Sequence, residues 1–165
     1  MIGRVGTDIF GPILLEELQG YGVDVKGVAT DSEHSSGIAV ILLNAERQNH
    51  IVQILGANMQ CDGRQLTVAR SFLDGANVLM LQLEIPHAVS LATAKEAKKL
   101  GVTVMWDPAP ASAGFPLKSF EALDVVTPNQ TEAEALTGIA VTDIRSAKSA
   151  AGRSVRCQKT TGEER

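Results

Sequence analysis

The chain has 165 residues, a formal net charge of −4, 44% hydrophobic residues and only 4% aromatic residues. This length favours one domain with a buried, mainly aliphatic core. The negative charge argues against a surface that binds nucleic acids irrespective of sequence. Two cysteines without metal-ligand spacing, no long apolar run and no signal-peptide pattern predict a cytoplasmic protein without membrane contact.

The first part of the chain predicts a helix followed by a β-hairpin. Asp8 is placed to cap a helix over residues 9–21, and Gly22 is placed to end it. A short strand is expected at 27–30. Two apolar runs, 37–43 and 50–55, flank a short polar segment, which predicts an antiparallel hairpin.

From residue 66 onward the pattern alternates between helix and strand. Strands are expected at 78–83, 102–106 and 123–127, and the first is apolar at nearly every position, as in a strand covered on both faces. Helices are predicted at 67–73, 87–100 and 131–137. A short helix or turn is predicted at 116–121.

A polar residue closely follows each of these three strands. Glu84, Asp107 and Asn129 are spaced at intervals of 23 residues (84 to 107) and 22 residues (107 to 129), about the length of a strand–helix–strand repeat. In a parallel sheet the carboxyl ends of the strands gather at one edge, where ligands of open α/β sheets bind. The spacing therefore predicts part of a ligand site.

Several short motifs occur in an order and spacing typical of one enzyme family. They are IGRVG at 2–6 followed by Asp8, SGIAVI at 36–41, GAN at 56–58, LQLEIP at 81–86, DPAPA at 107–111 and TPNQTEAE at 127–134. With these motifs, residues 1 to about 147 resemble the central portion of the ribokinase (PfkB-type) family of carbohydrate kinases.

The resemblance implies an α/β, Rossmann-like ribokinase fold: a parallel sheet flanked by helices, with a small β lid hairpin at about 37–58, incomplete at both ends. It implies ATP-dependent phosphorylation of a sugar, with ribose to ribose 5-phosphate as the first expectation. The family's Gly-Gly-Lys segment and its Gly-Ala-Gly-Asp motif, which carries the catalytic base, do not occur here. We therefore expect no catalytic residue in this chain and no activity from it alone.

By the same resemblance, Glu84 accepts hydrogen bonds from sugar hydroxyls, and Ala39 and Ile41 of the lid contact the sugar. An ionised carboxylate only accepts hydrogen bonds and can hold two hydroxyls. Alternate residues of a strand share one face. A surface glutamate before a helix, and ordinary sheet packing of Ala39 and Ile41, are the structural alternatives.

Asn129 and Glu132 match the family's Asn-x-x-Glu motif, which implies contacts near the phosphates of ATP and, through Glu132, ordering of Mg²⁺. A monovalent cation such as K⁺ is expected for the complete family member. The same two residues also suit a helix N-cap, and Thr131 with Glu134 has capping-box spacing. Asp107 stands where many ribokinases have Asn, which favours a structural role beside the site.

Residues 148–165 depart from the α/β pattern, being rich in charged and small residues. We expect the family pattern to break near Gly152, and residues 148–165 to be disordered or to come from a shifted reading frame. Other functions remain open: a fructokinase-like or nucleoside kinase, or a non-catalytic binding module. The expected partners are a small-molecule sugar, ATP and, through the lid hairpin, a second copy of the chain.

Overall fold

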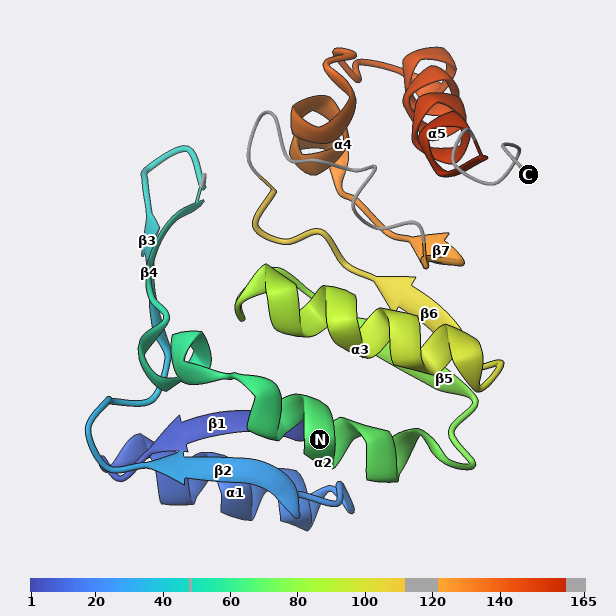
Figure 1. The fold of residues 1–165 in the computed structure, drawn as a ribbon. Helices are drawn as coiled ribbons and strands as arrows, with labels where there is room; N and C mark the ends of the chain where they lie inside the picture. The colour runs from blue at the N-terminus through green and yellow to red at the C-terminus, as the bar shows by residue number, and fades with distance from the viewer. Residues whose placement is uncertain (48, 112–121, 160–165) are drawn as a thin grey trace. The chain divides into compact units, whose positions relative to one another are not determined.

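The computed structural model describes residues 1–47, 49–111 and 122–159 (Figure 1). The chain divides into two compact units. The first contains Met1–Ala69 and Glu84–Val89, and the second contains Arg70–Leu83 and Ser90–Arg165. Among the described residues, no helix has the length and apolar character required to span a bilayer.

The first unit begins with a parallel strand–helix–strand element. Strand β1 (Ile2–Gly6) and strand β2 (Gly27–Asp31) pair in parallel, with helix α1 (Phe10–Gly20) between them in sequence. The capping role predicted for Asp8 is confirmed, because its Oδ1 accepts from the N–H groups of Phe10 and Gly11. Strand β1 was not predicted from the sequence.

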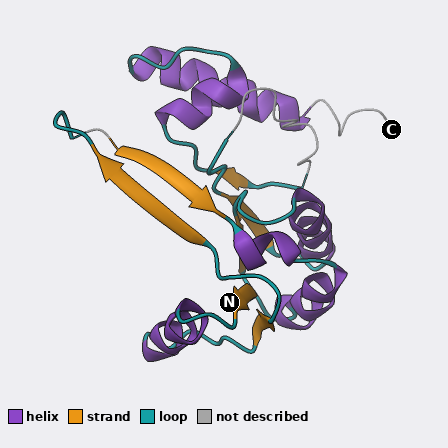
Figure 2. Ribbon diagram, turned by 90° about the vertical axis from the view of Figure 1, so that its left-hand side faces the viewer, coloured by secondary structure: helices purple, strands orange, loops and turns teal. Residues whose placement is uncertain are grey.

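The predicted hairpin is present in the same unit (Figure 2). Strands β3 (Ile38–Leu43) and β4 (Asn49–Ile54) form six antiparallel pairs. They lead into a 3-10 helix, η1 (Gly56–Gln60), and then into α2 (Gly63–Leu73), which begins four residues earlier than predicted. Gly56 adopts a φ of 49°, a left-handed conformation that glycine reaches without steric cost.

The second unit contains a parallel three-stranded sheet in the order β5 (Val78–Leu81), β6 (Thr103–Trp106) and β7 (Val125–Val126). Helix α3 (His87–Lys99) lies beside β5 and β6 (Figure 1). Its Ala94 and Ala97 are buried in the hydrophobic core with residues from the sheet and its connections. The other buried members are Leu73, Leu83, Val102, Val104, Trp106 and Leu123. The core is aliphatic as predicted, except for Trp106.

The expectation that the first of these strands is covered on both faces is wrong for the described part of the chain. Leu79 and Leu81 pack against the core, whereas Val78 and Met80, on the other face of β5, are 46% and 75% exposed. Apolar residues on both faces are typical of buried strands, but only the contacts that the strand makes decide whether both faces are covered.

Two helices end the described chain, α4 (Gln130–Thr137) and α5 (Ile144–Lys159). Helix α5 continues through Gly152 to Lys159, and the break in the family pattern expected near this glycine stays a prediction. The backbone N–H and the hydroxyl of Ser146 both donate to Asp143 Oδ1, which fixes the first turn of α5. Residues 116–121 and 160–165, on which other predictions fall, lie outside the described residues. The shifted reading frame stays a prediction.

Candidate functional site

Glu84 contacts the lid hairpin, the name we keep for residues 37–58. Its Oε1 accepts a hydrogen bond from Nε2 of Gln53 over 2.7 Å. Gln53 lies on β4 directly opposite Ala39 of β3. The three residues predicted to bind the sugar, Glu84, Ala39 and Ile41, all belong to the first unit.

The register of the hairpin shows which of its faces is turned toward Glu84. Ala39 pairs with Gln53 and Ile41 pairs with Ile51, and residues directly opposite each other in an antiparallel pair share a face. Ala39 and Ile41 therefore lie on the same face as the side chain that reaches Glu84. Both residues are exposed, so they are available to a ligand on that side.

Sequence reasoning missed Gln53, which is 31 residues from Glu84 along the chain. One signal was present: the alternation of β4 places the polar Gln53 on the same face as the apolar Ile51. The pattern alone does not identify its partner, because the hydrogen bond depends on a contact between distant segments.

The lid hairpin begins at a network of hydrogen bonds around Asp8. Oδ2 of Asp8 accepts from the backbone N–H of Ser36, and Oδ1 accepts from the Ser36 hydroxyl. Burial raises the pKa of Asp8, but the hydrogen bonds from Ser36, Gly11 and Phe10 outweigh it and leave the pKa below 3.8. Asp8 is therefore a charged anchor that joins the start of α1 to the start of the hairpin.

At the second unit, the three parallel strands end at one edge of the sheet. Leu81 pairs with Trp106, and Trp106 pairs with Val126. The N–H of Asp107 donates to the carbonyl of Leu81 over 2.9 Å. Asp107 thus follows directly at this edge with an exposed side chain, and Asn129 follows three residues after β7. The predicted parallel strands, each leading to a polar residue, are confirmed. Glu84 follows β5 by three residues, but its contacts assign it to the first unit.

Asn129 and Glu132 form a capping box at the start of α4. Oδ1 of Asn129 accepts from the N–H of Glu132 over 2.9 Å, and the N–H of Asn129 donates to Oε2 of Glu132 over 2.8 Å. The alternative capping box of Thr131 and Glu134 is wrong: the hydroxyl of Thr131 donates to Asn129, and Oε1 of Glu134 accepts from the N–H of Val141.

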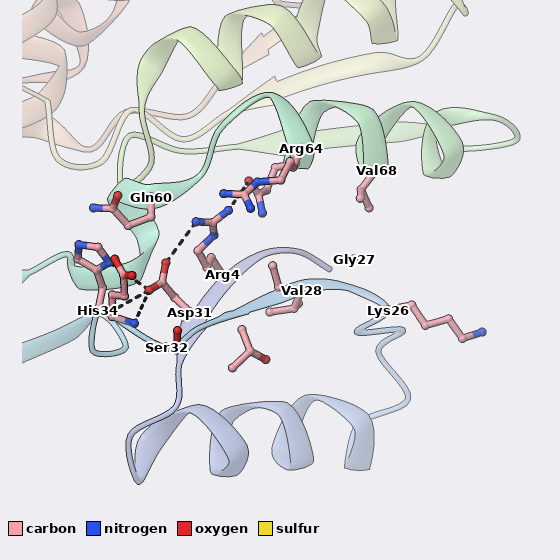
Figure 3. Close-up of a pocket in the computed structure, with 14 residues that line it drawn as sticks. Arg4, Lys26, Gly27, Val28, Asp31, Ser32, His34, Gln60, Arg64 and Val68 are labelled. Carbon is pink, nitrogen blue, oxygen red and sulfur yellow. Dashed lines mark hydrogen bonds and ion pairs between the residues drawn. The ribbon is translucent and has the colours of Figure 1, made fainter.

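A pocket of about 470 Å³ lies elsewhere in the first unit, between β2 and the start of α2 (Figure 3). Nη1 of the buried Arg4 donates to Asp31 over 3.2 Å, and Nη2 donates to Gln65 over 3.3 Å. Arg64 pairs with Asp62, and the side chain of Lys26 points away from Arg4. The two arginines are thus paired with carboxylates, and no residue predicted to bind sugar or ATP lines this pocket.

Metal-ligating side chains do not cluster within residues 1–47, 49–111 and 122–159. No group of three or more His, Cys, Asp or Glu there is arranged to hold a metal ion. Glu132 is a single half-buried carboxylate, and its Oε2 is already used by the capping box. Because Mg²⁺ keeps several water ligands, one carboxylate of this kind suits a contact through water.

Comparison with known proteins identifies the family. The model of the pfkB family of carbohydrate kinases matches residues 1–160. A ribokinase of Staphylococcus aureus is 35% identical over 147 residues, which cover 89% of this chain and 48% of the ribokinase. A deoxyribokinase of Salmonella typhi is 33% identical over 141 residues, 86% of this chain and 46% of that protein.

Solved structures agree with this result. The structure of Arabidopsis thaliana ribokinase complexed with ribose and ATP matches with a TM-score of 0.80 and 29% identity, over 94% of this chain and 51% of that one. A crystal structure of the protein Sa239 matches with a TM-score of 0.85 and 34% identity, over 94% and 51% respectively. The chain spans about half the length of the relatives that it matches. The predicted α/β ribokinase fold is thus confirmed, and the chain belongs to the pfkB family of carbohydrate kinases.

Proposed function

We propose that this chain carries part of the site of an ATP-dependent sugar kinase that converts ribose to ribose 5-phosphate. The observation that carries the proposal is the position of the Glu84 carboxylate beside the face of the lid hairpin that holds Ala39. An ionised carboxylate can accept two sugar hydroxyls, while the exposed Ala39 and Ile41 offer apolar contacts to the carbon atoms of a sugar. The Arabidopsis ribokinase complexed with ribose and ATP supports this choice of substrates.

Asn129 and Glu132 are the residues that we propose for contact with ATP. They stand at the start of α4, where N–H groups that lack helical partners favour the negative charge of a phosphate. Glu132 would hold Mg²⁺ through water, and the ion would neutralise charge on the phosphate oxygens. A monovalent cation such as K⁺ belongs to the same proposal for the complete family member.

We do not assign a catalytic base to this chain, because the Gly-Ala-Gly-Asp motif does not occur in its sequence. Phosphoryl transfer depends on positioned groups that stabilise the transferred phosphoryl group and orient the attacking hydroxyl. We therefore propose that the chain, taken alone, does not turn over ATP and sugar at a measurable rate.

A homodimer through the lid hairpin is a second part of the proposal. Eight large apolar side chains of β3 and β4 are at least 38% exposed. They are Ile38, Val40, Ile41, Leu42, Leu43, Ile51, Val52 and Ile54. Exposed apolar patches of this kind mark protein–protein interfaces. Sedimentation equilibrium of the chain and of Ile41→Lys tests this proposal; a wild-type monomer would contradict it.

A cytoplasmic location is also part of the proposal. Cys61 is a buried free thiol, and its burial raises its pKa. A raised pKa lowers the thiolate fraction and with it the reactivity of the sulfur, as suits a structural cysteine in a reducing compartment.

The substrate is tested by titrating the chain with ribose, 2-deoxyribose, fructose and adenosine in a calorimeter. We expect the tightest binding for ribose and a loss of about tenfold or more in Glu84→Ala, because a hydrogen-bonded carboxylate is removed. Glu16→Ala is the matched control, since Glu16 is exposed on α1. Tighter binding of fructose or adenosine would favour the fructokinase-like or nucleoside kinase alternative. Equal ribose affinity in Glu84→Ala would contradict the assigned role.

A further inference from the structure

We propose that Gln53 is a positioning residue that ties the lid hairpin to the sugar-binding carboxylate of Glu84. The inference rests on the function proposed above for Glu84. Gln53 has no role in the sequence motifs, and its hydrogen bond to Glu84 is the observation that carries the argument. It gives one lid residue a function that differs from the apolar contacts proposed for Ala39 and Ile41.

The chemistry of the two groups fixes the orientation of the Gln53 side chain. An ionised carboxylate only accepts hydrogen bonds, so the amide of Gln53 must turn its NH₂ group toward Glu84. A bond to a charged acceptor is shorter and stronger than a bond between neutral groups, in keeping with the distance of 2.7 Å. The same carboxylate has lone pairs for further donors, so a sugar hydroxyl and Gln53 can bind it together.

The strands of the lid hairpin are exposed on both faces in the part of the chain that the structure describes. Ile41 on one face is 60% exposed, and Val40 on the other face is 49% exposed. A two-stranded hairpin is at best marginally stable by itself. At its base, the N–H of Ala57 donates to the carbonyl of Ser35 over 2.7 Å. The hydrogen bond of Gln53 adds a side-chain contact beyond this base.

The location of Gln53 near the base of the hairpin allows it to orient the whole hairpin. The pair Ala39–Gln53 is second from the base of the hairpin, next to Ile38–Ile54. A bond at this point sets the direction in which the rest of the hairpin extends, so a small shift at Gln53 becomes a larger displacement at the tip. Because Glu84 is shared, the position of the lid and the affinity for sugar are coupled, and each stabilises the other.

Amide hydrogen exchange in β3 and β4 tests the tie without requiring activity. In Gln53→Met we expect these amides to exchange about three- to tenfold faster, the factor expected for the loss of one partly exposed hydrogen bond. In Gln53→Glu we expect at least as large an increase, because two carboxylates would face each other. His50→Met is the matched control: it changes an exposed polar residue of the same strand on the opposite face and should leave exchange unchanged.

The double variant Gln53→Glu with Glu84→Gln exchanges the two groups. The amide at position 84 can then donate to the carboxylate at position 53, so we expect the slow exchange of the wild type to return. Unchanged exchange in both Gln53→Met and Gln53→Glu, or no recovery in the double variant, would overturn the inference.

Ribose binding to the same variants separates this inference from the proposed function. We expect Gln53→Met to weaken ribose binding by about the same factor by which it speeds amide exchange in the hairpin. In the double variant we expect slow amide exchange to return, whereas ribose affinity stays low. Weaker ribose binding with unchanged exchange would show that Gln53 is a direct sugar contact, and the positioning role would be wrong. If the wild type does not bind ribose but the variants change amide exchange as expected, the proposed function is wrong. The positioning role of Gln53 toward Glu84 is then still supported.

Discussion

Ser36 donates to the carboxylate of Asp8 with both its backbone N–H and its hydroxyl, over 2.6 and 2.9 Å. The Ser36 hydroxyl also accepts from the N–H of Gly6 over 3.0 Å. One fully buried side chain thus joins the end of β1, the start of α1 and the entry to the lid hairpin.

We predict that Ser36→Ala lowers the free energy of unfolding by about 1–3 kcal/mol, because it leaves buried polar groups without their partner. Urea denaturation followed by circular dichroism measures the change. Ser35→Ala is the control, since Ser35 is exposed and its replacement should cost less than about 0.5 kcal/mol. Equal stability of the two variants would show that the network contributes little.

Asp31 provides a prediction about pH. Hydrogen bonds from the Glu33 N–H and from His34 lower the pKa of this carboxyl from 3.8 to about 2, although burial opposes the shift. A lowered pKa in the folded state stabilises the protein above pH 3.8, and this contribution is lost as the pH falls from 3.8 toward 2.

Urea midpoints measured between pH 2 and 6 test this prediction. We expect the wild type to lose stability more steeply than Asp31→Asn in this range, so that the difference between the two narrows as the pH falls. Asp74→Asn, a change of the same kind at an exposed position, serves as the control. A difference that is constant with pH would be evidence against the role of Asp31.

Substitutions in the capping box of α4 can separate the structural role of Asn129 and Glu132 from their proposed role in nucleotide binding. We predict that Asn129→Ala costs about 1 kcal/mol of stability, whereas Asn129→Ser, which keeps a capping oxygen, costs little. Glu132→Gln also keeps an oxygen that can accept from the N–H of Asn129, so its stability should stay near that of the wild type.

If Glu132 acts on the nucleotide as proposed, Glu132→Gln should weaken binding of ADP in the presence of Mg²⁺ while its unfolding curve is unchanged. Calorimetric titration measures the affinity, and the same titration without Mg²⁺ is the control. Unchanged affinity would leave only the capping role for this side chain.

Trp106 is the largest fully buried side chain. We predict that Trp106→Ala destabilises the second unit by about 3–5 kcal/mol, because the cavity left in the core is only partly refilled. Far-UV circular dichroism follows the unfolding, since the variant lacks the single tryptophan of the chain. Tyr21→Ala, at a position that is 84% exposed, should change stability by less than about 0.5 kcal/mol.

The elements that the sequence predicted best are those with a local pattern and local end signals. The hairpin, the helix that begins at His87 and the strand that ends at Trp106 were all predicted with bounds close to those observed. Alternating apolar residues, helix-ending glycines and polar turns act over a few residues, so one sequence is enough to show them.

Two elements, strand β1 and the later part of α5, were not predicted from the sequence. Strand β1 contains two glycines and an arginine, which weaken a strand pattern, and its five-residue pairing with β2 compensates. Helix α5 extends past Gly152, because one glycine in a helix costs only about 1 kcal/mol and α5 contains several alanine, lysine and arginine residues that favour a helix.

The sequence by itself therefore determined the family, the hairpin, the strands of the sheet and the residues Glu84, Asn129 and Glu132 as candidates. Only the tertiary structure decided which side chains meet. The contact of Gln53 with Glu84, the burial of Arg4 beside Asp31 and the network of Ser36 with Asp8 each join residues 27 to 31 positions apart. Such contacts depend on how distant segments pack, and local periodicity carries no information about that.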